Sequence, residues 1–446
     1  MIVMKFGGTS VESAAAIERV AGIVKARLDR HPIVIVSAMG KTTNRLLGIA
    51  HHAINGHRDD ALRELLALRD FHLRESGMER TVDEHFQELS ELVKGLAILG
   101  ELTPRSIDAI SSFGERLSSL IVAHHFERFG LKTRHVDSRK VIITDTRHTQ
   151  AAPLFDITYE RLEEHVPPLA RNAVVVMGGF VGSTETGVTT TLGRGGSDFT
   201  ASIVGAGIGA EEIQIWTDVD GMLTADPTIL KNGHRVRTCS FAEAAELAYF
   251  GAKVLHPATV LPAVEKNIPV LILNSRRPEV EGTRIVSEAV HSTNVAKSIA
   301  CKKSITLVNI HSTRMLMAHG FLRRIFEIFD RHETPVDMIA TSEVSVSLTV
   351  DRPDRLPEIR RELEQFSEVS IEEDQSIICL VGDNIRYTPG VAARVFTALG
   401  DVNVRMVSQG ASLLNIGFVV AKKDLQRATE ALHQEFFHTL DPEVFA

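Results

Sequence analysis

A glycine-rich turn carries the residues best suited to chemistry. Residues 192–201 read Leu-Gly-Arg-Gly-Gly-Ser-Asp-Phe-Thr-Ala, and the small residues that follow predict a helix over 199–208. The three glycines permit unusual dihedrals and close approach of a ligand to the backbone. Arg194 is a planar fork suited to a carboxylate or phosphate, and Ser197 and Asp198 would lie near a helix N-terminus, which favours an anion. The turn therefore predicts a site for a small zwitterion beside a phosphate. The alternative is an ordinary surface turn, and the neighbouring motifs decide between the two.

The N-terminus offers a second glycine turn. An apolar strand over residues 1–6 runs into Gly7-Gly8-Thr9-Ser10 and then into an amphipathic helix, with Lys5 at the edge. A strand, a Gly-Gly turn and a helix can cradle phosphate groups, and Lys5 would add a point charge. Gly40-Lys41-Thr42 follows the next strand, but a P-loop needs a glycine where Ile35 stands. A P-loop is therefore excluded.

Further polar groups follow other apolar strands. Strands over 173–177 and 212–217 end in Gly178-Gly179-Phe180 and in the polar run 217–221. In open α/β sheets, ligands bind outside the carboxyl ends of the strands, so these strand ends should share one site. Glu115 begins a helix after Phe-Gly. It is either a carboxylate favoured by the helix dipole or a ligand for an ammonium group, and its own neighbours leave both open.

Length and composition limit the class of protein. A chain of 446 residues is long enough for two or three domains, and a net charge of −8 with a pI near 6.2 argues against a nucleic-acid binder. No run is long enough to span a membrane and no signal-peptide pattern is present, so a cytoplasmic location is expected. Cys239, Cys301 and Cys379 are isolated and should be reduced. We expect no metal site built from protein side chains.

The chain changes its pattern near residue 300. Residues 1–280 alternate strands and helices, with a helical region over about 57–130, and predict a catalytic α/β domain. Residues 281–300 are expected to form a linker. Residues 301–374 and 375–446 each read as a β-α-β-β-α-β unit, which predicts two ferredoxin-like α+β modules. The second unit lacks its last strand, so exchange of a strand between the modules is an open alternative.

Together these motifs resemble those of the aspartate kinases, most closely the monofunctional, lysine-sensitive type, over essentially the whole chain. The resemblance implies an amino-acid-kinase fold, a three-layer αβα open sheet, followed by two ACT modules. It also implies transfer of the γ-phosphoryl group of ATP, with Mg²⁺, to the β-carboxylate of L-aspartate. The product, 4-phospho-L-aspartate, would begin the synthesis of lysine, threonine, methionine and isoleucine. A homodimer through the ACT modules, or a tetramer, is expected. The motifs that carry the resemblance are 5–10, 37–44, 112–115, 192–198, 216–221 and 251–257.

The resemblance also implies roles for individual residues. Arg194 would hold the α-carboxylate of aspartate, and Glu115 and Asp198 its ammonium group. Lys5 and Lys253 would place positive charge on the transferred phosphoryl group, with Asp198 as the third catalytic residue. The other implied contacts are Thr43, Phe180, Gly195 and Ser197 for aspartate, and Gly7, Gly8, Ser10, Thr217, Asp218, Leu223, Lys253 and Val254 for ATP.

One departure from the family pattern falls beside the nucleotide motif. An aromatic residue and an Asp-Pro-Arg usually follow Asp220-Gly221, whereas this chain has Leu223 and Asp226-Pro227-Thr228. Leu223 can still cover the adenine as a hydrophobic group, so weaker ATP binding or a relaxed choice of nucleotide is expected rather than loss of activity.

The first ACT module resembles a lysine-binding module. A glycine at a helix start offers backbone N–H groups to an α-carboxylate, and Asp337 and Glu343 can hold ammonium groups. Without the resemblance, the apolar members would simply be core and Asp337 a turn residue. Ala318 stands where the family often has a hydroxyl residue, which predicts reduced sensitivity. The residues implied are Met315, Gly320, Phe321, Leu322, Val336, Asp337, Ser342 and Glu343.

Two rival functions remain at this stage. The kinase domain could have become a nucleotide-binding scaffold of an amino-acid sensor, which only Leu223 and Thr228 favour. The chain could instead be another amino-acid kinase, acting on acetylglutamate or a nucleoside monophosphate, but those enzymes lack the regulatory tail. Fusion to a homoserine dehydrogenase is excluded because no dinucleotide fingerprint follows the ACT modules.

Overall fold

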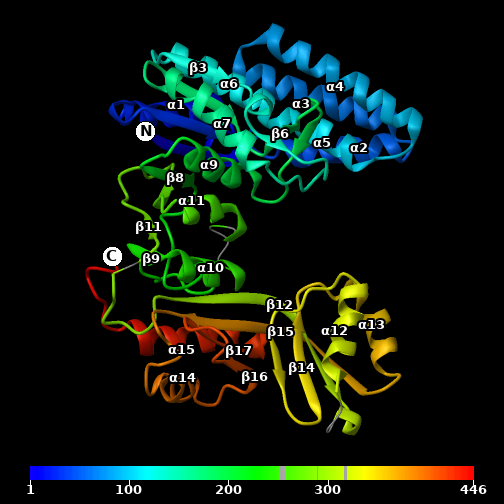
Figure 1. Cartoon of the computed structure of the whole chain (residues 1–446), viewed down its shortest axis with the longest axis vertical. Coiled ribbons are helices and arrows are strands. Elements are labelled where there is room, and N and C mark those ends of the chain that lie inside the picture. The colour runs from blue at the N-terminus through cyan, green and yellow to red at the C-terminus, as the bar shows by residue number, and fades with distance from the viewer. Residues whose placement is uncertain (252–254, 256, 289, 316–318) are drawn as a thin grey trace. The chain divides into compact units, whose positions relative to one another are not determined.

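The computed structural model describes residues 1–251, 255, 257–288, 290–315 and 319–446 (Figure 1). It divides into two compact units, the first formed by Met1–Met222 and Val254–Glu288 and the second by Leu223–Lys253 and Ala289–Ala446. Residues 223–253, which come from the middle of the chain, thus fold with the C-terminal part. The fold class predicted from the sequence is confirmed: an open α/β sheet is followed by an antiparallel α+β region.

The first unit is built on a sheet with the strand order β3-β5-β2-β1-β8-β10-β11. Its central strands pair in parallel, and β11 pairs antiparallel to β10. All residues of β1, β2 and β5 are buried, as expected for a parallel sheet covered on both faces. The strands are β1 (Ile2–Phe6), β2 (Pro32–Val36), β3 (Thr133–Val136), β5 (Val174–Gly178), β8 (Glu212–Thr217), β10 (Val270–Asn274) and β11 (Thr283–Val286).

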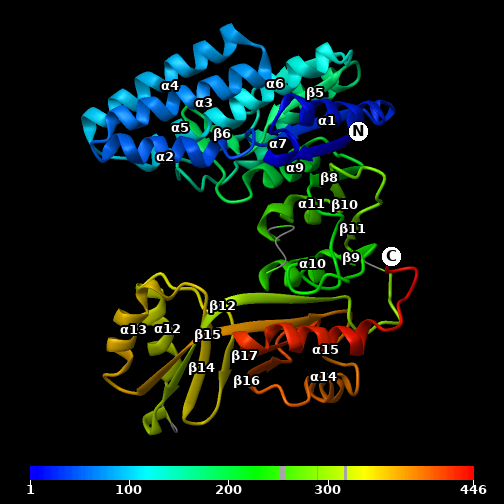
Figure 2. The ribbon, with the colours of Figure 1, turned by 180° about the vertical axis from the view of Figure 1, so that it is seen from behind.

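Helices cover this sheet, and a group of long helices extends from it (Figure 2). The residues of α3 and α4 that face inward, Leu65, Leu68, Phe86, Leu89 and Val93, recur at helical spacing and join the core of the unit. The helices are α1 (Ala14–Lys25), α2 (Thr42–Ile54), α3 (Arg58–Ser76), α4 (Glu79–Leu99), α5 (Pro104–Ser111), α6 (Phe113–Arg128), α7 (Phe155–His165), α8 (Pro167–Ala170), α9 (Gly196–Gly207) and α11 (Leu261–Glu265).

A small sheet is formed by β4 (Ile143–Thr144), which precedes β5 in the chain, and by β6 (Val181–Thr184) and β7 (Thr189–Thr191), which lie between β5 and α9. β7 consists of three threonines and leads directly into the glycine-rich turn. The helix after that turn starts at Gly196, three residues before the predicted start. Ser197 and Asp198 therefore lie inside its first turn.

The second unit contains one six-stranded antiparallel sheet with the order β13-β14-β12-β15-β17-β16. Its two longest strands, β12 and β15, run side by side through its centre (Figure 1). The strands are β12 (Ser298–His311), β13 (Ile339–Thr341), β14 (Ser345–Val350), β15 (Glu368–Val381), β16 (Val404–Gln409) and β17 (Asn415–Ala421). The helices are α12 (Phe321–Arg331), α13 (Leu356–Leu363), α14 (Val391–Leu399) and α15 (Leu425–Phe437), with β9 (Thr238–Ser240) and α10 (Phe241–Tyr249) from the inserted segment.

The central strands serve both halves of this sheet. The C-terminal part of β12 pairs with β14, while its first residues, Ser298 to Lys302, pair with the end of β15. That N-terminal part supplies the fourth strand that the second β-α-β-β-α-β unit lacks in its own sequence. The register of β12 against β15 shifts between Lys302 and Leu307, which marks the passage from one half to the other.

Three local expectations differ from the structure. The last strand expected in the first β-α-β-β-α-β unit and the first strand expected in the second form one continuous strand, β15, which stays beside β12 with a register shift where the partners pass from Glu372 to Gln375. The strand expected after the first helix of the first unit is short, β13, Ile339–Thr341. Within the stretch expected to connect the domains, Thr283–Val286 form β11. Among the described helices, none is long and apolar enough to cross a membrane.

Candidate active site

A cavity of about 270 Å³ lies in the first unit at the carboxyl ends of the parallel strands. It collects residues that are far apart in the sequence but follow β1, β2, β5 and β7 or begin α2, α6 and α9. Seven of the residues predicted for the site line it. The full lining is Lys5, Ser37, Thr43, Glu115, Phe180, Gly193, Gly195, Gly196, Ser197 and Asp198.

Lys5 and Asp198 form an ion pair within this cavity. The Nζ atom of Lys5 lies 2.6 Å from Oδ1 of Asp198, and both side chains are largely buried. Lys5 ends its strand beside the first glycine turn, and a Cβ at Gly7 would lie 3.8 Å from its Nζ. The lysine is therefore placed where a phosphate held by that turn would meet it.

Glu115 is the second carboxylate of the cavity and has no cationic partner among the residues that the structure describes. Only 4 % of the residue is exposed, and its Oε2 atom has no hydrogen-bond partner among the described residues. Burial raises the pKa of Glu115 to about 8, although hydrogen bonds from the backbone of Ala38 and of Glu115 itself offset part of this effect. A buried carboxyl group with a free oxygen on a polar cavity is suited to receive a cation from a ligand.

The turn that carries Phe180 is held in an unfavourable conformation. Phe180 has φ +65°, a region that non-glycine residues rarely adopt, and its N–H donates to the Thr200 hydroxyl at 2.9 Å. Thr200 in turn donates to the carbonyl of Gly196, so α9 and the Phe180 turn are fixed to each other. Such local strain is typical of a binding site whose shape is imposed by its surroundings.

Arg194 takes a different position from its neighbours. Gly193 and Gly195 line the cavity, but Arg194 is exposed and is not among the lining residues. Its role toward a carboxylate therefore stays a prediction.

Phosphate-binding residues predicted at the first glycine turn lie in a compact network. The hydroxyls of Ser10 and Ser275 are 2.8 Å apart, and Ser275 also hydrogen-bonds the carbonyl of Thr217. Gly8 needs to be glycine because a Cβ there would lie 2.8 Å from the carbonyl oxygens of Ala38 and Gly40. The ends of β1, β2, β8 and β10 are thereby brought together.

The other residues predicted to bind the nucleotide are distributed differently. Thr217 donates to the exposed Asp218 at 3.2 Å at the end of β8. Leu223 belongs to the second unit, where its carbonyl accepts a hydrogen bond from Ser298. Lys253 and Val254 lie outside the described residues, so their predicted roles stay predictions.

Sequence reasoning missed three kinds of residue around the cavity. Ser37 lines it directly, and Ser275 ties the first glycine turn to β8. Asp108 is fully buried and accepts hydrogen bonds from Thr149 N at 3.0 Å, from His148 Nδ1 at 2.7 Å and from the Thr191 hydroxyl, just before the glycine-rich turn. Ser37 could have been found as the polar residue ending a buried strand. The sequence carries no comparable signal for Asp108, which lies on a helix far from the turn it supports.

The residues predicted for the allosteric site are of two kinds. Phe321 belongs to the core of the first half of the second sheet, against which Met315 and Val336 pack. Gly320, with φ +79°, caps the start of α12, and Leu322, Ser342 and Glu343 are exposed. Ala318 lies outside the described residues.

Asp337 already has a cationic partner. Lys302 Nζ lies 2.6 Å from its Oδ1 atom and 2.9 Å from Asp351 Oδ2. Burial raises the pKa of Asp337, although the Lys302 charge offsets part of this effect, and its Oδ2 atom has no hydrogen-bond partner among the described residues.

No protein cage for a metal is found among the described residues, where no group of three or more His, Cys, Asp or Glu side chains is arranged to hold an ion.

Two family models match the chain. The model of the amino acid kinase family matches residues 1–274, and a model of the ACT domain matches residues 378–436. The first match covers more than half of the chain and contains every residue of the cavity. The second lies within the C-terminal half of the six-stranded sheet.

Similar proteins share nearly the full length. Aspartokinase 1 of Arabidopsis thaliana, a chloroplastic protein, is 39 % identical over 98 % of this chain and 80 % of its own. Lysine-sensitive aspartokinase 3 of Escherichia coli K12 is 35 % identical, over 98 % of this chain and 99 % of its own. Crystal structures of E. coli aspartokinase III, one with lysine and aspartate and one with aspartate and ADP, each match with a TM-score of 0.84 and 34 % identity. They cover 98 % of this chain and 99 % or 100 % of their own.

Proposed function

The chain belongs to the amino acid kinase family and, within it, to the aspartokinases, and from this premise we propose that its cavity phosphorylates the β-carboxylate of L-aspartate with ATP. The observation that carries the proposal is the cavity itself. It combines a buried carboxyl group without a cation, Glu115, with the Lys5–Asp198 pair beside a glycine turn.

An amino acid fits this arrangement through its charges. Its ammonium group would pair with Glu115 and Asp198, and its α-carboxylate would meet the N–H groups at the start of α9 and the side chain of Arg194. Thr43, Phe180, Gly195 and Ser197 would limit the space around it. The E. coli relative, whose crystal structures contain aspartate, supports aspartate as the amino acid.

The chemistry asks for positioning rather than for a general base. A carboxylate is already a nucleophile at neutral pH, so one of its oxygens attacks the γ-phosphorus of ATP, the bond from phosphorus to the β,γ-bridging oxygen breaks, and ADP leaves. The barrier comes from bringing two anions together, which positive charge and backbone N–H groups lower.

Lys5 is proposed to neutralise the transferred phosphoryl group. It exchanges its contact with Asp198 for one with the phosphate, while Asp198 turns to the ammonium group of the amino acid. Gly7, Gly8 and Ser10 would hold phosphate oxygens, and Thr217, Asp218 and Leu223 would contact the nucleotide, with Lys253 and Val254 against its base and phosphate side. Mg²⁺ bound with the nucleotide would neutralise charge between its phosphates, with Asp218 as the nearby carboxylate.

The direct test is a comparison of acceptors. ATP consumption is measured with L-aspartate, L-glutamate or acetylglutamate, and hydroxylamine is added to trap an acyl phosphate as the hydroxamate. We expect trapped product only with L-aspartate. Product with acetylglutamate would favour the rival amino-acid kinase, and no product with any acceptor, while ATP still binds, would favour the amino-acid sensor.

We further propose feedback inhibition by lysine through the second unit, as the name of the lysine-sensitive E. coli relative supports. Lysine would place its α-carboxylate at the start of α12, at Gly320, and an ammonium group on Asp337 or Glu343. The enzyme would then serve the synthesis of lysine, threonine and methionine in the cytoplasm, as a homodimer or tetramer assembled through its ACT modules. Asp337→Ala should raise the lysine concentration for half-inhibition at least about tenfold with the uninhibited rate kept. Unchanged inhibition in this variant would remove Asp337 from the lysine site.

A further inference from the structure

A second cavity, of about 60 Å³, lies in the first unit next to the active-site cavity. Its lining includes two guanidinium groups, Arg116 of α6 and Arg139, and two imidazoles, His85 of α4 and His135 of β3. Asp137 is the one carboxylate among its lining residues. None of these side chains is used by the proposed phosphoryl transfer.

Arg116 lines this cavity with its guanidinium group, which has few partners among the described residues. Its side chain is 15 % exposed, it stacks 4.3 Å from the ring of Phe113, and Glu88 is the one carboxylate that it contacts among the described residues, at 3.3 Å. Glu88 is 56 % exposed and does not line the cavity. Burial, and then the charge of Arg139, lower the pKa of Arg116. With five N–H donors on a guanidinium, most of its donor capacity stays available.

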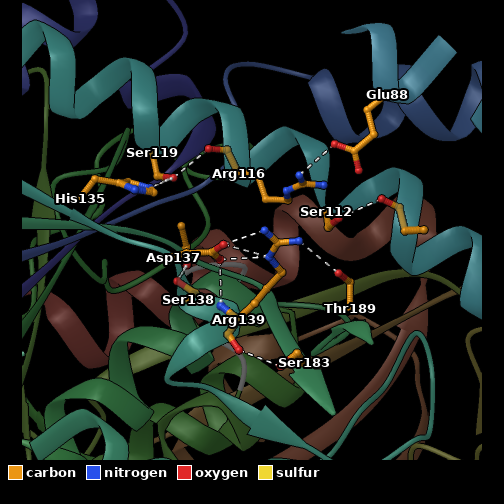
Figure 3. A network of polar contacts seen from close by, with 12 residues as sticks. Glu88, Ser112, Arg116, Ser119, His135, Asp137, Ser138, Arg139, Ser183 and Thr189 are labelled. Atoms are coloured by element: carbon orange, nitrogen blue, oxygen red, sulfur yellow. Dashed lines mark hydrogen bonds and ion pairs between the residues drawn. The ribbon is translucent and has the colours of Figure 1, made fainter. Parts of the chain in front are cut away.

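Arg139 faces Arg116 across the cavity (Figure 3). Its Nη2 donates to Asp137 at 2.6 Å and its Nε to both carboxylate oxygens, whereas its Nη1 reaches only the Thr189 hydroxyl at 3.5 Å. Asp137 therefore neutralises one edge of Arg139 and leaves the other edge turned toward Arg116.

The hydroxyl groups of the cavity are already engaged with its walls. Ser138 donates to the carbonyl of Gly178 at 2.5 Å, and Ser119 donates to the carbonyl of Arg116 at 3.0 Å. Because that proton of Ser119 is used, its contact of 2.9 Å with Nε2 of His135 has the imidazole as donor. The donors left to face a ligand are therefore those of the two guanidinium groups, because Nδ1 of His85 and Nε2 of His135 already contact the Thr81 carbonyl and Ser119.

We propose that this second cavity binds a small oxyanion, a carboxylate or a phosphate group, between Arg116 and Arg139. Two guanidinium forks whose charges repel each other are both stabilised by an anion between them, and their planar geometry matches either group. A volume of about 60 Å³ admits a group of a few atoms and excludes a whole nucleotide. The inference does not depend on the proposed kinase activity.

The second cavity lies against a backbone segment that also shapes the active-site cavity. Gly178, which lines the second cavity, is so close to α6 that a Cβ there would lie 2.9 Å from the carbonyl of Glu115. The residues that follow it form the strained turn of Phe180, which lines the first cavity. An anion between the arginines would thus contact the same backbone segment that shapes the aspartate pocket.

The test measures binding of inorganic phosphate and of acetate to the full-length protein by calorimetry and thermal shift, at ionic strength held constant with chloride. We expect saturable binding of at least one of the two, and the comparison identifies which oxyanion the cavity prefers. Arg139→Gln should weaken it at least about tenfold, because it removes a charge-assisted donor and leaves Asp137 unpaired. Arg134→Gln, which removes an exposed arginine of the neighbouring strand, is the matched control and should bind as the parent does.

Two further measurements separate this site from the active-site cavity. Lys5→Ala should keep the phosphate affinity if the anion binds between the arginines, and should lose it if the anion binds beside Lys5. In the unsubstituted protein, NMR signals of the His85 and His135 imidazoles should shift on titration, a readout that holds even if Arg139→Gln fails to fold. Arg116→Lys, which keeps the charge and removes the fork, should weaken binding as well. The proposal is wrong if neither anion binds saturably in the millimolar range, or if Lys5→Ala abolishes binding while Arg139→Gln leaves it unchanged.

Discussion

Glu115 and Arg116 are consecutive residues of α6, yet they line two different cavities, which are proposed to bind groups of opposite charge. Successive side chains on a helix point about 100° apart, so one helix can serve two cavities on neighbouring faces. In the first cavity a buried carboxyl group has no cationic partner among the described residues, whereas in the second two guanidinium groups lie together, one paired with Asp137 and the other with the exposed Glu88. Both cavities thus hold buried polar groups whose hydrogen-bonding capacity the described residues do not fill, and a ligand can fill it.

The largest effect should come from the cation of the first cavity. Lys5→Ala should lower kcat about 10³-fold, since the charge acts mainly on the transferred phosphoryl group, while binding of aspartate is largely kept. Steady-state kinetics and aspartate calorimetry on the same samples would check this. Lys132→Ala, at an exposed lysine, is the control. Equal losses in kcat and in aspartate affinity would show that Lys5 holds the amino acid instead.

The next effect concerns the uncompensated carboxyl group. Glu115→Gln keeps the shape of the cavity but removes the charge that would receive the ammonium group, so KM for aspartate should rise about 100-fold with a smaller change in kcat. Thermal stability should not fall, because the variant no longer has an ionisable group to bury. A KM for aspartate within twofold of the parent's would show that Glu115 does not bind the ammonium group, and the two cavities would then not differ in the charge that they bind.

The raised pKa of Glu115 makes a separate prediction about pH. In the free protein the carboxyl group is protonated below about pH 8, whereas an ordinary glutamate ionises near 4.5. Binding an ammonium group needs the ionised form, so KM for aspartate should rise as the pH falls below 8, by up to about tenfold per unit. The stabilising contribution of the protonated group is complete below pH 4.5 and is lost as the pH rises through 8. Both dependences should flatten in Glu115→Gln, and a KM that is independent of pH between 6 and 8 would contradict the assignment.

The smallest predicted effect lies at the wall between the cavities. Gly178→Ala would place a Cβ 2.9 Å from the Glu115 carbonyl, so β5 or α6 must shift, at a cost of about 1–3 kcal/mol. Thermal unfolding should show a lower Tm, and binding in both cavities should change together. Gly48→Ala, at an open position of α2, is the control and should be neutral or stabilising. An unchanged Tm in Gly178→Ala would show that β5 and α6 accommodate the added methyl group at little cost.

Much of the fold follows from local patterns. Buried parallel strands were predicted as continuous apolar runs, and the change at residue 300 from alternating strands and helices to ferredoxin-like units was visible as a change of order. Some boundaries moved for tertiary reasons. The residues between 372 and 377 are too polar to predict a strand alone, but the paired residues on both sides, Glu372 and Gln375, keep this part of β15 beside β12.

The residues of the candidate site were likewise predicted only in part. Lys5, Thr43, Glu115, Phe180 and Gly195 line the cavity as members of motifs that end strands or begin helices, as do Ser197 and Asp198. Ser275 and Asp108 were missed because a serine after a strand and an aspartate in a helix have no distinctive spacing. Their importance comes from contacts with residues far away in the chain.

The sequence by itself determined which groups could bind anions and ammonium ions, since glycine turns, helix starts and charged side chains are local features. Only the tertiary structure decided that Lys5 meets Asp198, that Glu115 keeps an oxygen without a partner, and that Arg116 faces Arg139. The physical reason is that burial and long-range pairing set the free energy of a charge. Both depend on segments that meet only when parallel strands bring their carboxyl ends to one edge of a sheet.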